Sequence, residues 1–114
     1  MTKTFKIINN GKQIGQIKGS IYSEDGAKYI GLGDFEIYPE YQNKGYGTKA
    51  LKELISKLKL DYDLIYCYVD KNNDRAVHIY SKLGRIKDTG EQFMCVFYDK
   101  TGEYSTYNRL NDAE

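Results

Sequence analysis

A short run near the middle of the chain, QNKGYG, holds the residues with the clearest chemical use. Gly45 and Gly47 fall where an apolar helical rhythm begins, although glycine is unfavourable within a helix. The first turn of a helix has unpaired N–H groups and the positive end of the helix dipole. Glycines there let an anionic group approach the backbone itself. The run therefore predicts an anion site, and the alternative is a tight turn without a ligand.

Two familiar phosphate-binding loops fit these residues poorly. A Walker A loop requires Gly-Lys followed by Ser or Thr, whereas Gly47-Thr48-Lys49 has the reverse order. A dinucleotide fingerprint requires three glycines, and its third position is Ala50, which the looser form of the pattern tolerates. The strands before the loop predict a meander, and 114 residues are too few for a dinucleotide fold. A nucleotide-binding regulator is therefore the weakest of the functions considered.

A third pattern does fit. Residues 42–47 match Q/R-x-x-G-x-G/A and follow a β-rich run that ends at Pro39. Downstream, residues 73–84 match N-x-x-A-x-x-x-Y-x-x-L-G. The two patterns occur in this order, with a helix and an apolar strand between them. In this arrangement they resemble the acyl-CoA-binding motif and the second signature of the GNAT superfamily of N-acetyltransferases, over roughly residues 4 to 110.

The resemblance implies that acetyl-CoA is the co-substrate, without a metal. In this superfamily two parallel strands splay apart, and the pantetheine arm of the co-substrate lies in the opening. By position, the backbone amides of Phe35 and Ile37 would contact the acyl and pantetheine groups. The pyrophosphate would sit on the backbone of Gln42, Asn43, Lys44, Gly45, Tyr46, Gly47 and Thr48.

Three side chains near these positions have two interpretations each. Lys44 and Lys49 could form charge-assisted contacts with phosphate, or could simply be solvated. Asn73 corresponds to a residue that binds the pantetheine arm or caps the following helix. An N-cap asparagine requires no ligand, so both roles stay open.

The resemblance also assigns Tyr80 as the proton donor for the departing thiolate of CoA. A phenol with a pKa near 10 is protonated at neutral pH and can serve in this way. The alternative is an aromatic side chain that packs on the inner face of its helix. His78 lies two residues earlier, on another face, and is expected to be a surface histidine.

The general base is harder to assign. Asp34 and Glu36 alternate with apolar residues, so both carboxylates are expected on one face of a central strand. A carboxylate in that position would be desolvated and its pKa raised, as a base requires. Glu36 is the preferred candidate, and the alternative is a structural or acceptor-orienting carboxylate.

The elements that must position these residues follow from periodicity. Residues 4–9 and 13–22 are β-rich and flank Asn10-Gly11, a strong hairpin signal, and 28–38 form a third β-rich run. These three predict an antiparallel meander. A helical rhythm runs from Tyr46 to Leu58, and the apolar run 64–69 predicts a buried strand. Together with the third strand they form a βαβ crossover with two parallel strands.

The remainder of the chain predicts a short second helix and a closing hairpin. The helix covers 75–83 and ends at Gly84 in the position that favours a left-handed glycine. The hairpin joins 92–98 to 103–110 through the turn DKTG. The fold class is therefore mixed α+β, in a single domain over residues 1–114.

The composition and charge of the chain argue against several classes of function. A net charge of +1 argues against a general nucleic-acid-binding protein. The N-terminus lacks the apolar segment of a signal peptide, and no apolar run approaches about 18 residues, so we expect a cytoplasmic protein that binds no membrane. Cys67 and Cys95 lie within apolar runs and predict reduced core cysteines rather than a metal site.

The chain also departs from the superfamily pattern. Most members begin with a strand and one or two helices that wall the acceptor site, and nothing before Thr4 could supply them. We therefore expect an open acceptor side and a bulky acceptor, such as a protein lysine or N-terminus, with a polyamine or aminoglycoside as alternatives. Arg85 stands where phenylalanine is usual. An exposed sheet edge also suggests a homodimer.

Two functions remain from this reading. The first is an enzyme that transfers acetyl from acetyl-CoA to a primary amine by direct attack. The second is a non-catalytic module that binds acyl-CoA and has lost a formed acceptor site.

Overall fold

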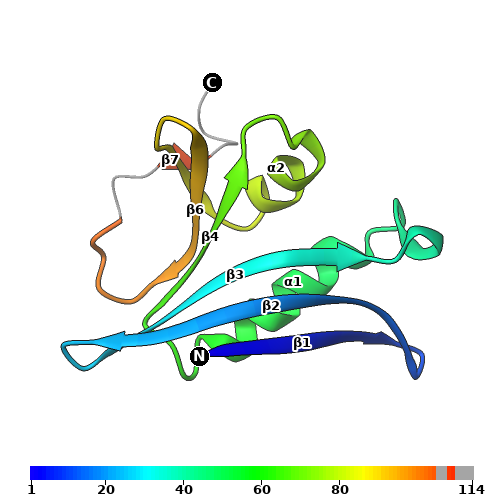
Figure 1. Cartoon of the computed structure of the whole chain (residues 1–114), viewed down its shortest axis with the longest axis horizontal. Helices are drawn as coiled ribbons and strands as arrows, with labels where there is room; N and C mark the ends of the chain where they lie inside the picture. The colour runs from blue at the N-terminus through cyan, green and yellow to red at the C-terminus, as the bar shows by residue number, and fades with distance from the viewer. Residues whose placement is uncertain (105–107, 110–114) are drawn as a thin grey trace.

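A seven-stranded mixed sheet organises the computed structural model, which describes residues 1–104 and 108–109. The strands lie in the order β1-β2-β3-β4-β6-β5-β7, and Figure 1 shows their arrangement. The strands are β1 (Thr2–Asn9), β2 (Lys12–Glu24), β3 (Ala27–Ile37), β4 (Leu64–Asp70), β5 (Arg85–Asp88), β6 (Gln92–Asp99) and β7 (Asn108–Arg109). The helices are η1 (Pro39–Tyr41), α1 (Tyr46–Leu58) and α2 (Asp74–Ser81).

The antiparallel meander predicted for the first three strands is confirmed, since β1 pairs with β2 and β2 with β3. Both connections are tight turns with left-handed residues. Asn10 and Gly11 have φ angles of 51° and 78°, and Asp25 and Gly26 have φ angles of 51° and 82°. Two consecutive left-handed residues match the right-handed twist of the strands they join.

A β-bulge interrupts β3. Lys18 lies opposite Gly33 and Gln16 opposite Glu36, so β3 has one residue more than β2 between these pairs. Asp34 lies within this bulge with a left-handed φ of 49°. A bulge of this kind bends the strand and exchanges the faces to which later side chains point.

The bulge explains why the inward-facing apolar residues of β3 change from even-numbered to odd-numbered positions. Before it, the even-numbered Ile30 and Leu32 are buried. After it, the odd-numbered Phe35 and Ile37 are half-buried, and Phe35 packs against the same core cluster. All four side chains therefore lie on the same face of the sheet.

The two parallel strands of the predicted crossover are confirmed, and they part after a short ladder. β3 and β4 pair from Tyr29 opposite Leu64 to Leu32 opposite Cys67. Beyond these residues β3 continues to Ile37 without pairing to β4. The C-terminal halves of the two strands therefore flank an opening.

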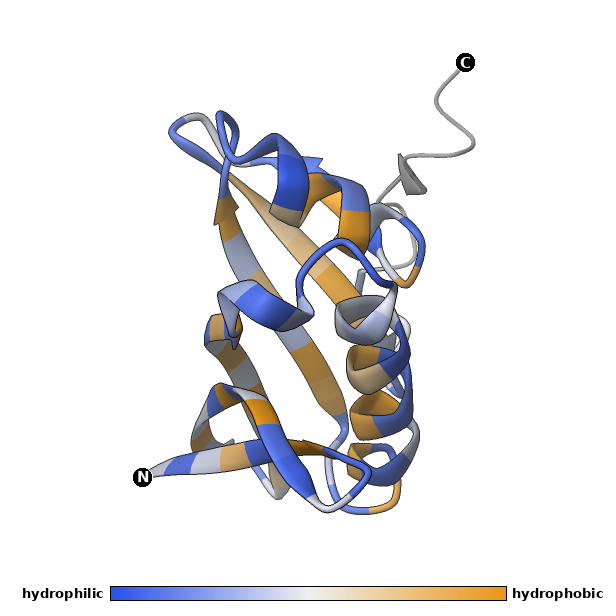
Figure 2. Ribbon diagram, turned by 90° about the vertical axis from the view of Figure 1, so that its right-hand side faces the viewer, coloured by the Kyte–Doolittle hydropathy of each residue, from blue (hydrophilic) through white to orange (hydrophobic). Residues whose placement is uncertain are grey.

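Both α-helices pack on one face of the sheet. Leu51, Ile55 and Leu58 of α1 share one core cluster with Tyr80 of α2. In Figure 2 the apolar side of α1 faces the strands and its hydrophilic side faces solvent. The opposite face has a smaller buried cluster of Leu64, Tyr66, Met94 and Val96.

Two expectations for the C-terminal part are wrong. β6 forms its hairpin with β5, a strand that the sequence reading missed, and β7 pairs with β5 rather than with β6. Of the strand predicted at 103–110, positions 103–104 form a turn, and 105–107 and 110 lie outside the described residues. Gly84 does not adopt a left-handed φ. It is glycine because a β-carbon there would lie 2.6 Å from Cys95 Sγ.

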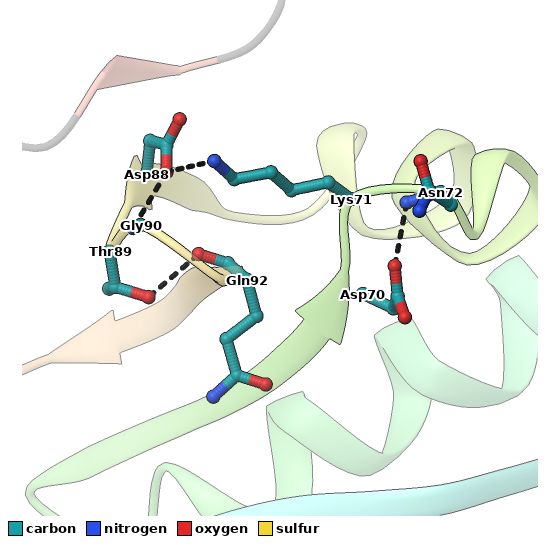
Figure 3. A network of polar contacts seen from close by, with 7 residues as sticks. All are labelled: Asp70, Lys71, Asn72, Asp88, Thr89, Gly90 and Gln92. Atoms are coloured by element: carbon teal, nitrogen blue, oxygen red, sulfur yellow. Dashed lines mark hydrogen bonds and ion pairs between the residues drawn. The ribbon is translucent and has the colours of Figure 1, made fainter.

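Polar contacts fix the turn that precedes α2 (Figure 3). Lys71 Nζ lies 2.5 Å from Asp88 Oδ1 in the β5–β6 hairpin, and the Gly90 amide donates to the same carboxylate at 2.8 Å. The hydrogen bond from Lys71 lowers the pKa of Asp88. The Asn72 amide donates to Asp70 Oδ1 at 2.8 Å. The start of α2 is thereby held against the end of the sheet.

The bulge yields a direct test. Deleting Asp34 should turn Phe35 and Ile37 to the opposite face and lower the free energy of unfolding by about 3 kcal/mol. Asp34→Gly is the matched control, because it keeps the extra residue and tolerates the left-handed φ. The control should stay within about 1 kcal/mol, since the exposed Lys18–Asp34 ion pair contributes little. Urea unfolding measures both, and equal stabilities would contradict the role given to the bulge.

Candidate active site

A cleft of about 680 Å³ lies where β3 and β4 part. Its walls come from the end of β3, the loop and first turn of α1, the end of β4, and α2. It is lined by all but one of the predicted site residues: Phe35, Glu36, Ile37, Gln42, Asn43, Gly45, Tyr46, Gly47, Thr48, Asn73 and Tyr80. Lys44 does not line it. The fold thus brings together the two sequence patterns, which lie some 30 residues apart.

The loop before α1 presents unpaired donors to this cleft. Gly45 is the N-cap of α1, with a φ of 83° and no side-chain cap. Among the described residues, none of the backbone N–H groups of 43–48 donates a hydrogen bond. Unpaired N–H groups at a helix N-terminus together with the helix dipole favour an anion. The loop therefore has the chemistry of a phosphate site.

The two glycines of the loop serve different purposes. Gly45 needs to be glycine for its backbone, because its φ of 83° is unfavourable for other residues. Gly47 is buried, and a β-carbon there would lie 3.4 Å from Phe35 and 3.5 Å from Ile37. These are ordinary van der Waals distances to residues that line the cleft. Gly47 thus leaves open a volume that a side chain would occupy.

Arg75, which the sequence reading did not select, joins α2 to the loop. Its guanidinium donates to Gln42 Oε1 at 2.7 Å and to Asn43 Oδ1 at 3.3 Å. Gln42 in turn donates from Nε2 to the Ile37 carbonyl at 2.7 Å. The only signal in the sequence was its place two residues after Asn73, at the start of the predicted second helix.

The lysines expected near phosphate lie elsewhere. Lys44 is exposed and does not line the cleft. Lys49 lines a separate groove of about 280 Å³ between β1 and α1. Arg75 instead supplies a positive side chain that hydrogen-bonds to the loop. Solvated lysines are the better interpretation for Lys44 and Lys49.

Asn73 acts as the N-cap of α2. Its Oδ1 accepts a hydrogen bond from the Ala76 amide at 3.1 Å. The capping role is thus observed. Asn73 also lines the cleft, so a contact between its side chain and a pantetheine arm stays a prediction.

Tyr80 is 9% exposed and packs between two phenylalanines. Its ring centroid lies 6.4 Å from that of Phe35 and 5.7 Å from that of Phe97. Every fully buried side-chain oxygen and nitrogen in residues 1–104 and 108–109 has a hydrogen-bond partner, whereas the Tyr80 hydroxyl forms no hydrogen bond with these residues. The hydroxyl is therefore accessible from the cleft and free to bind a ligand.

Burial keeps this hydroxyl protonated. Desolvation raises the pKa of Tyr80 well above the usual value of a phenol, and the nearby thiols of Cys67 and Cys95 raise it further. A raised pKa favours the neutral phenol, so Tyr80 holds its proton at neutral and mildly alkaline pH. Its position suits a proton donor rather than a base.

The expected desolvation of Asp34 and Glu36 is wrong. Both residues are exposed, and Asp34 lies 3.7 Å from Lys18 with 78% of its side chain accessible. The bulge breaks the simple alternation that placed both carboxylates on one buried face. Glu36 still lines the cleft, so its role as a base stays a prediction without support from burial.

Several other expectations concern residues outside the cleft or at its rim. His78 is exposed, as predicted, although it also lines the cleft. Cys67 and Cys95 are confirmed as free and buried. No group of metal-ligating side chains is found in residues 1–104 and 108–109. Within the same ranges no helix is both long and apolar enough to span a membrane.

The space at Gly47 predicts opposite effects on stability and binding. Gly47→Ala should raise the melting temperature slightly, since alanine is the better helix former, and weaken the affinity for CoA. Gly47→Asp should weaken that affinity by about 100-fold or more, because it adds a negative charge beside a phosphate site. Calorimetric titration with CoA measures both. Tight CoA binding by Gly47→Asp would remove the loop from the proposed site.

The Arg75 contacts predict a charge-dependent effect on the loop. Arg75→Gln should weaken CoA affinity by about tenfold, because a positive charge and two hydrogen bonds to the loop are lost. Arg75→Lys should recover part of that loss. Lys52→Gln on the exposed side of α1 is the control for removal of one positive charge. An equal loss in the control would mean that only net charge matters.

Comparison with known proteins agrees with this geometry. The family model described as "Acetyltransferase (GNAT) family" matches residues 3–84. Spermidine N(1)-acetyltransferase of Escherichia coli is 46% identical over 55 residues. That match spans 42% of this chain and 27% of the enzyme, so the chain covers about a quarter of the relative's length.

Solved structures extend the likeness over more of the chain. The PaiA N-acetyltransferase of Thermoplasma acidophilum, in complex with coenzyme A, has a TM-score of 0.69 at 24% identity, over 85% of this chain and 60% of that one. A GNAT family acetyltransferase of Elizabethkingia anophelis with acetyl-CoA bound has a TM-score of 0.67 at 18% identity, over 86% and 76%. At these identities the likeness shows the fold. Together with the family match over most of its length, it places this chain in the acetyltransferase (GNAT) family.

Proposed function

We propose that the protein is an N-acetyltransferase that moves an acetyl group from acetyl-CoA to a primary amine. The observation that carries this proposal is one cleft that contains both the unpaired N–H groups of residues 43–48 and the free hydroxyl of Tyr80. One part of the cleft suits a phosphate and the other suits a proton donor. The loop and Tyr80 lie far apart in the sequence, so a shared function explains their meeting in one cleft better than chance does.

The residues present fit acetyl-CoA. The loop N–H groups and Arg75 would hold the pyrophosphate. Phe35 and Ile37 would flank the pantetheine arm, and the adjacent unpaired edge of β3 offers backbone partners for its amides. Lys44 is proposed for its backbone only, since its side chain does not line the cleft.

Transfer forms a carbon–nitrogen bond as the thioester carbon–sulfur bond breaks, and the leaving thiolate of CoA takes up a proton. Tyr80 would supply that proton from its hydroxyl. The amine must lose a proton, and Glu36 is the proposed acceptor of it, directly or through water. Glu36 is exposed, so solvent has access to this carboxylate.

One specific observation favours the alternative of a non-catalytic acyl-CoA-binding module. Among the described residues, no carboxylate that lines the cleft is buried. A module of this kind would bind acetyl-CoA through the same loop without releasing thiol in the presence of amines. We also propose a cytoplasmic location and a homodimer through the free outer edge of β1, as expected from the sequence.

Thermal unfolding with separate additions of acetyl-CoA, CoA and ATP tests the binding half of the proposal. A shift with acetyl-CoA and CoA but not with ATP is the expected result. An amine screen that detects free thiol then tests transfer. Stabilisation by ATP alone would contradict the donor site, and stabilisation by acetyl-CoA without thiol release would favour the binding module.

The role of Tyr80 predicts a selective loss. Tyr80→Phe should lower kcat by about 100-fold or more and change acetyl-CoA affinity little, because the ring packing is retained. In the wild type, loss of the Tyr80 proton should lower the rate only above pH 10, since its pKa is raised. Steady-state kinetics across pH measure both. An unchanged kcat in Tyr80→Phe would exclude the residue as proton donor.

A further inference from the structure

Two of the eleven glycines have no structural reason to be glycine within the described residues. Five of the others have a left-handed φ: Gly11, Gly26, Gly45, Gly90 and Gly102. At four more, a β-carbon would come within 3.0 Å of neighbouring atoms: Gly15, Gly19, Gly31 and Gly84. The two that remain are Gly33 and Gly47, and both line the cleft.

Gly33 lies within β3, where glycine is unfavourable because it loses much conformational freedom on folding. No atom of residues 1–104 and 108–109 would lie within 4 Å of a β-carbon at this position. The bulge does not require glycine there, since its left-handed residue is Asp34. Glycine within a strand often marks the close approach of a ligand or of another backbone. Because no protein atom comes close to Gly33, we look to a ligand.

A side chain at position 33 would point away from the helices. Ile30 and Leu32 belong to the core cluster on the helix side, whereas the ring of Tyr66 covers Gly31 on the other face. Side chains alternate between the two faces along a strand, and the bulge begins only after Gly33. Positions 31 and 33 therefore share the face that has Tyr66.

Gly33 also marks the point at which β3 and β4 part. Leu32 opposite Cys67 is the last pair of the parallel ladder, so Gly33 and Tyr68 are the next positions along the two strands. Both line the cleft, and Tyr68 is 51% exposed. Its ring meets that of Tyr66 edge to face at 5.8 Å, on the face away from the helices. One side of the opening is thus an aromatic ring, and the other is bare backbone.

The proposed donor site lies on the helix side of this opening. The loop before α1 and Arg75 of α2 would hold the pyrophosphate, and Phe35 packs with the helices in the core cluster. With a donor in that place, an amine can reach the thioester only from the other face, between Gly33 and Tyr68. Lys18 lies opposite Gly33 on β2 but does not line the cleft, so it leaves this approach open.

We propose that Gly33 sets the limit on the bulk around the acceptor amine. This rests on the proposed acetyl transfer and concerns the acceptor side of the same cleft. Without a side chain at position 33, substituents on the carbon that bears the amine can lie beside Tyr68 while the nitrogen reaches the thioester. Gly33 takes no part in the bond changes or proton transfers of the reaction. It is a specificity-determining residue rather than a catalytic one.

Melting temperatures test whether the fold needs this glycine. Gly33→Ala should raise the melting temperature by about 3 °C, because alanine restricts the unfolded chain and meets no atom in the folded one. Gly31→Ala is the matched control on the same strand and face. It should lower the melting temperature by about 5 °C or more, since its β-carbon would lie 2.9 Å from the ring of Tyr66. A lower melting temperature in Gly33→Ala would show a structural need for glycine and overturn the proposal.

Thiol labelling tests the opening without any acetyl transfer. In Gly33→Cys, iodoacetamide should modify the new thiol at least about tenfold faster than Cys67 and Cys95, which are buried. Saturating acetyl-CoA, with no amine present, should change this rate less than twofold, because the donor lies on the helix side. Protection by acetyl-CoA would place the donor at Gly33 and contradict its assignment to the acceptor.

Two isomeric amines test the limit on bulk. The carbon next to nitrogen is unbranched in 1-aminobutane and branched in 2-aminobutane, while charge and atom number are the same. Gly33→Val should lower kcat/KM for 2-aminobutane at least about tenfold more than for 1-aminobutane, because the new side chain occupies the space of the branch. The KM for acetyl-CoA should stay unchanged. Thiol release measures all of these rates.

The outcomes separate this proposal from the proposed function. Thiol release that Gly33→Val lowers equally for both amines would overturn the role of Gly33 and leave the transferase standing. Absence of thiol release from every amine would contradict the transferase and, with it, an acceptor role for Gly33. Fast labelling of Gly33→Cys that acetyl-CoA leaves unchanged, together with selective loss of the branched amine in Gly33→Val, is the expected result for both.

Discussion

The separation of β3 and β4 beyond Leu32 and Cys67 is the constraint on which the rest of the structure depends. A parallel pair inside a sheet normally continues its ladder, because buried backbone groups need partners. Here the ladder stops and leaves the edge of β3 exposed to a cleft. The bulge at Asp34 keeps Phe35 and Ile37 on the helix side of that edge. An extended ligand would pair its amide groups with the exposed edge of β3 and pack its apolar arm against Phe35 and Ile37.

Charge is distributed unevenly along the cleft. The loop before α1 offers N–H groups, and the guanidinium of Arg75 on α2 lies against this loop. Glu36 and Asp70 lie on the sheet face that has Tyr66 and Tyr68. An anionic donor and a cationic acceptor would therefore approach from different sides. Their reactive groups would meet in the opening between the strands. Tyr80 reaches that opening from the helix side, where burial keeps it neutral.

Much of this architecture could be predicted from the sequence, for identifiable reasons. The Asn-Gly turn, the rhythm of α1 and the apolar run of β4 are local signals, and all three elements form as expected. The loop glycines were also recognisable, because their spacing is specific. The strand β5 was missed because Arg85–Asp88 is short and polar, and its pairing with β6 depends on tertiary context. The desolvation of Glu36 was wrongly predicted because alternation was extended through a bulge. The switch from even to odd apolar positions in β3 was the available sign of that bulge.

Arg75 and Tyr80 lie on the same short helix, five residues apart. Arg75 holds the loop through Gln42, and Tyr80 packs on Phe35 of β3. α2 therefore connects the loop at one end of the cleft to the phenol at the other. For the proposed transferase, a donor that shifts the loop would also act on the short helix that holds Tyr80. The nucleotide end and the reacting end of the cleft would then not be independent of each other.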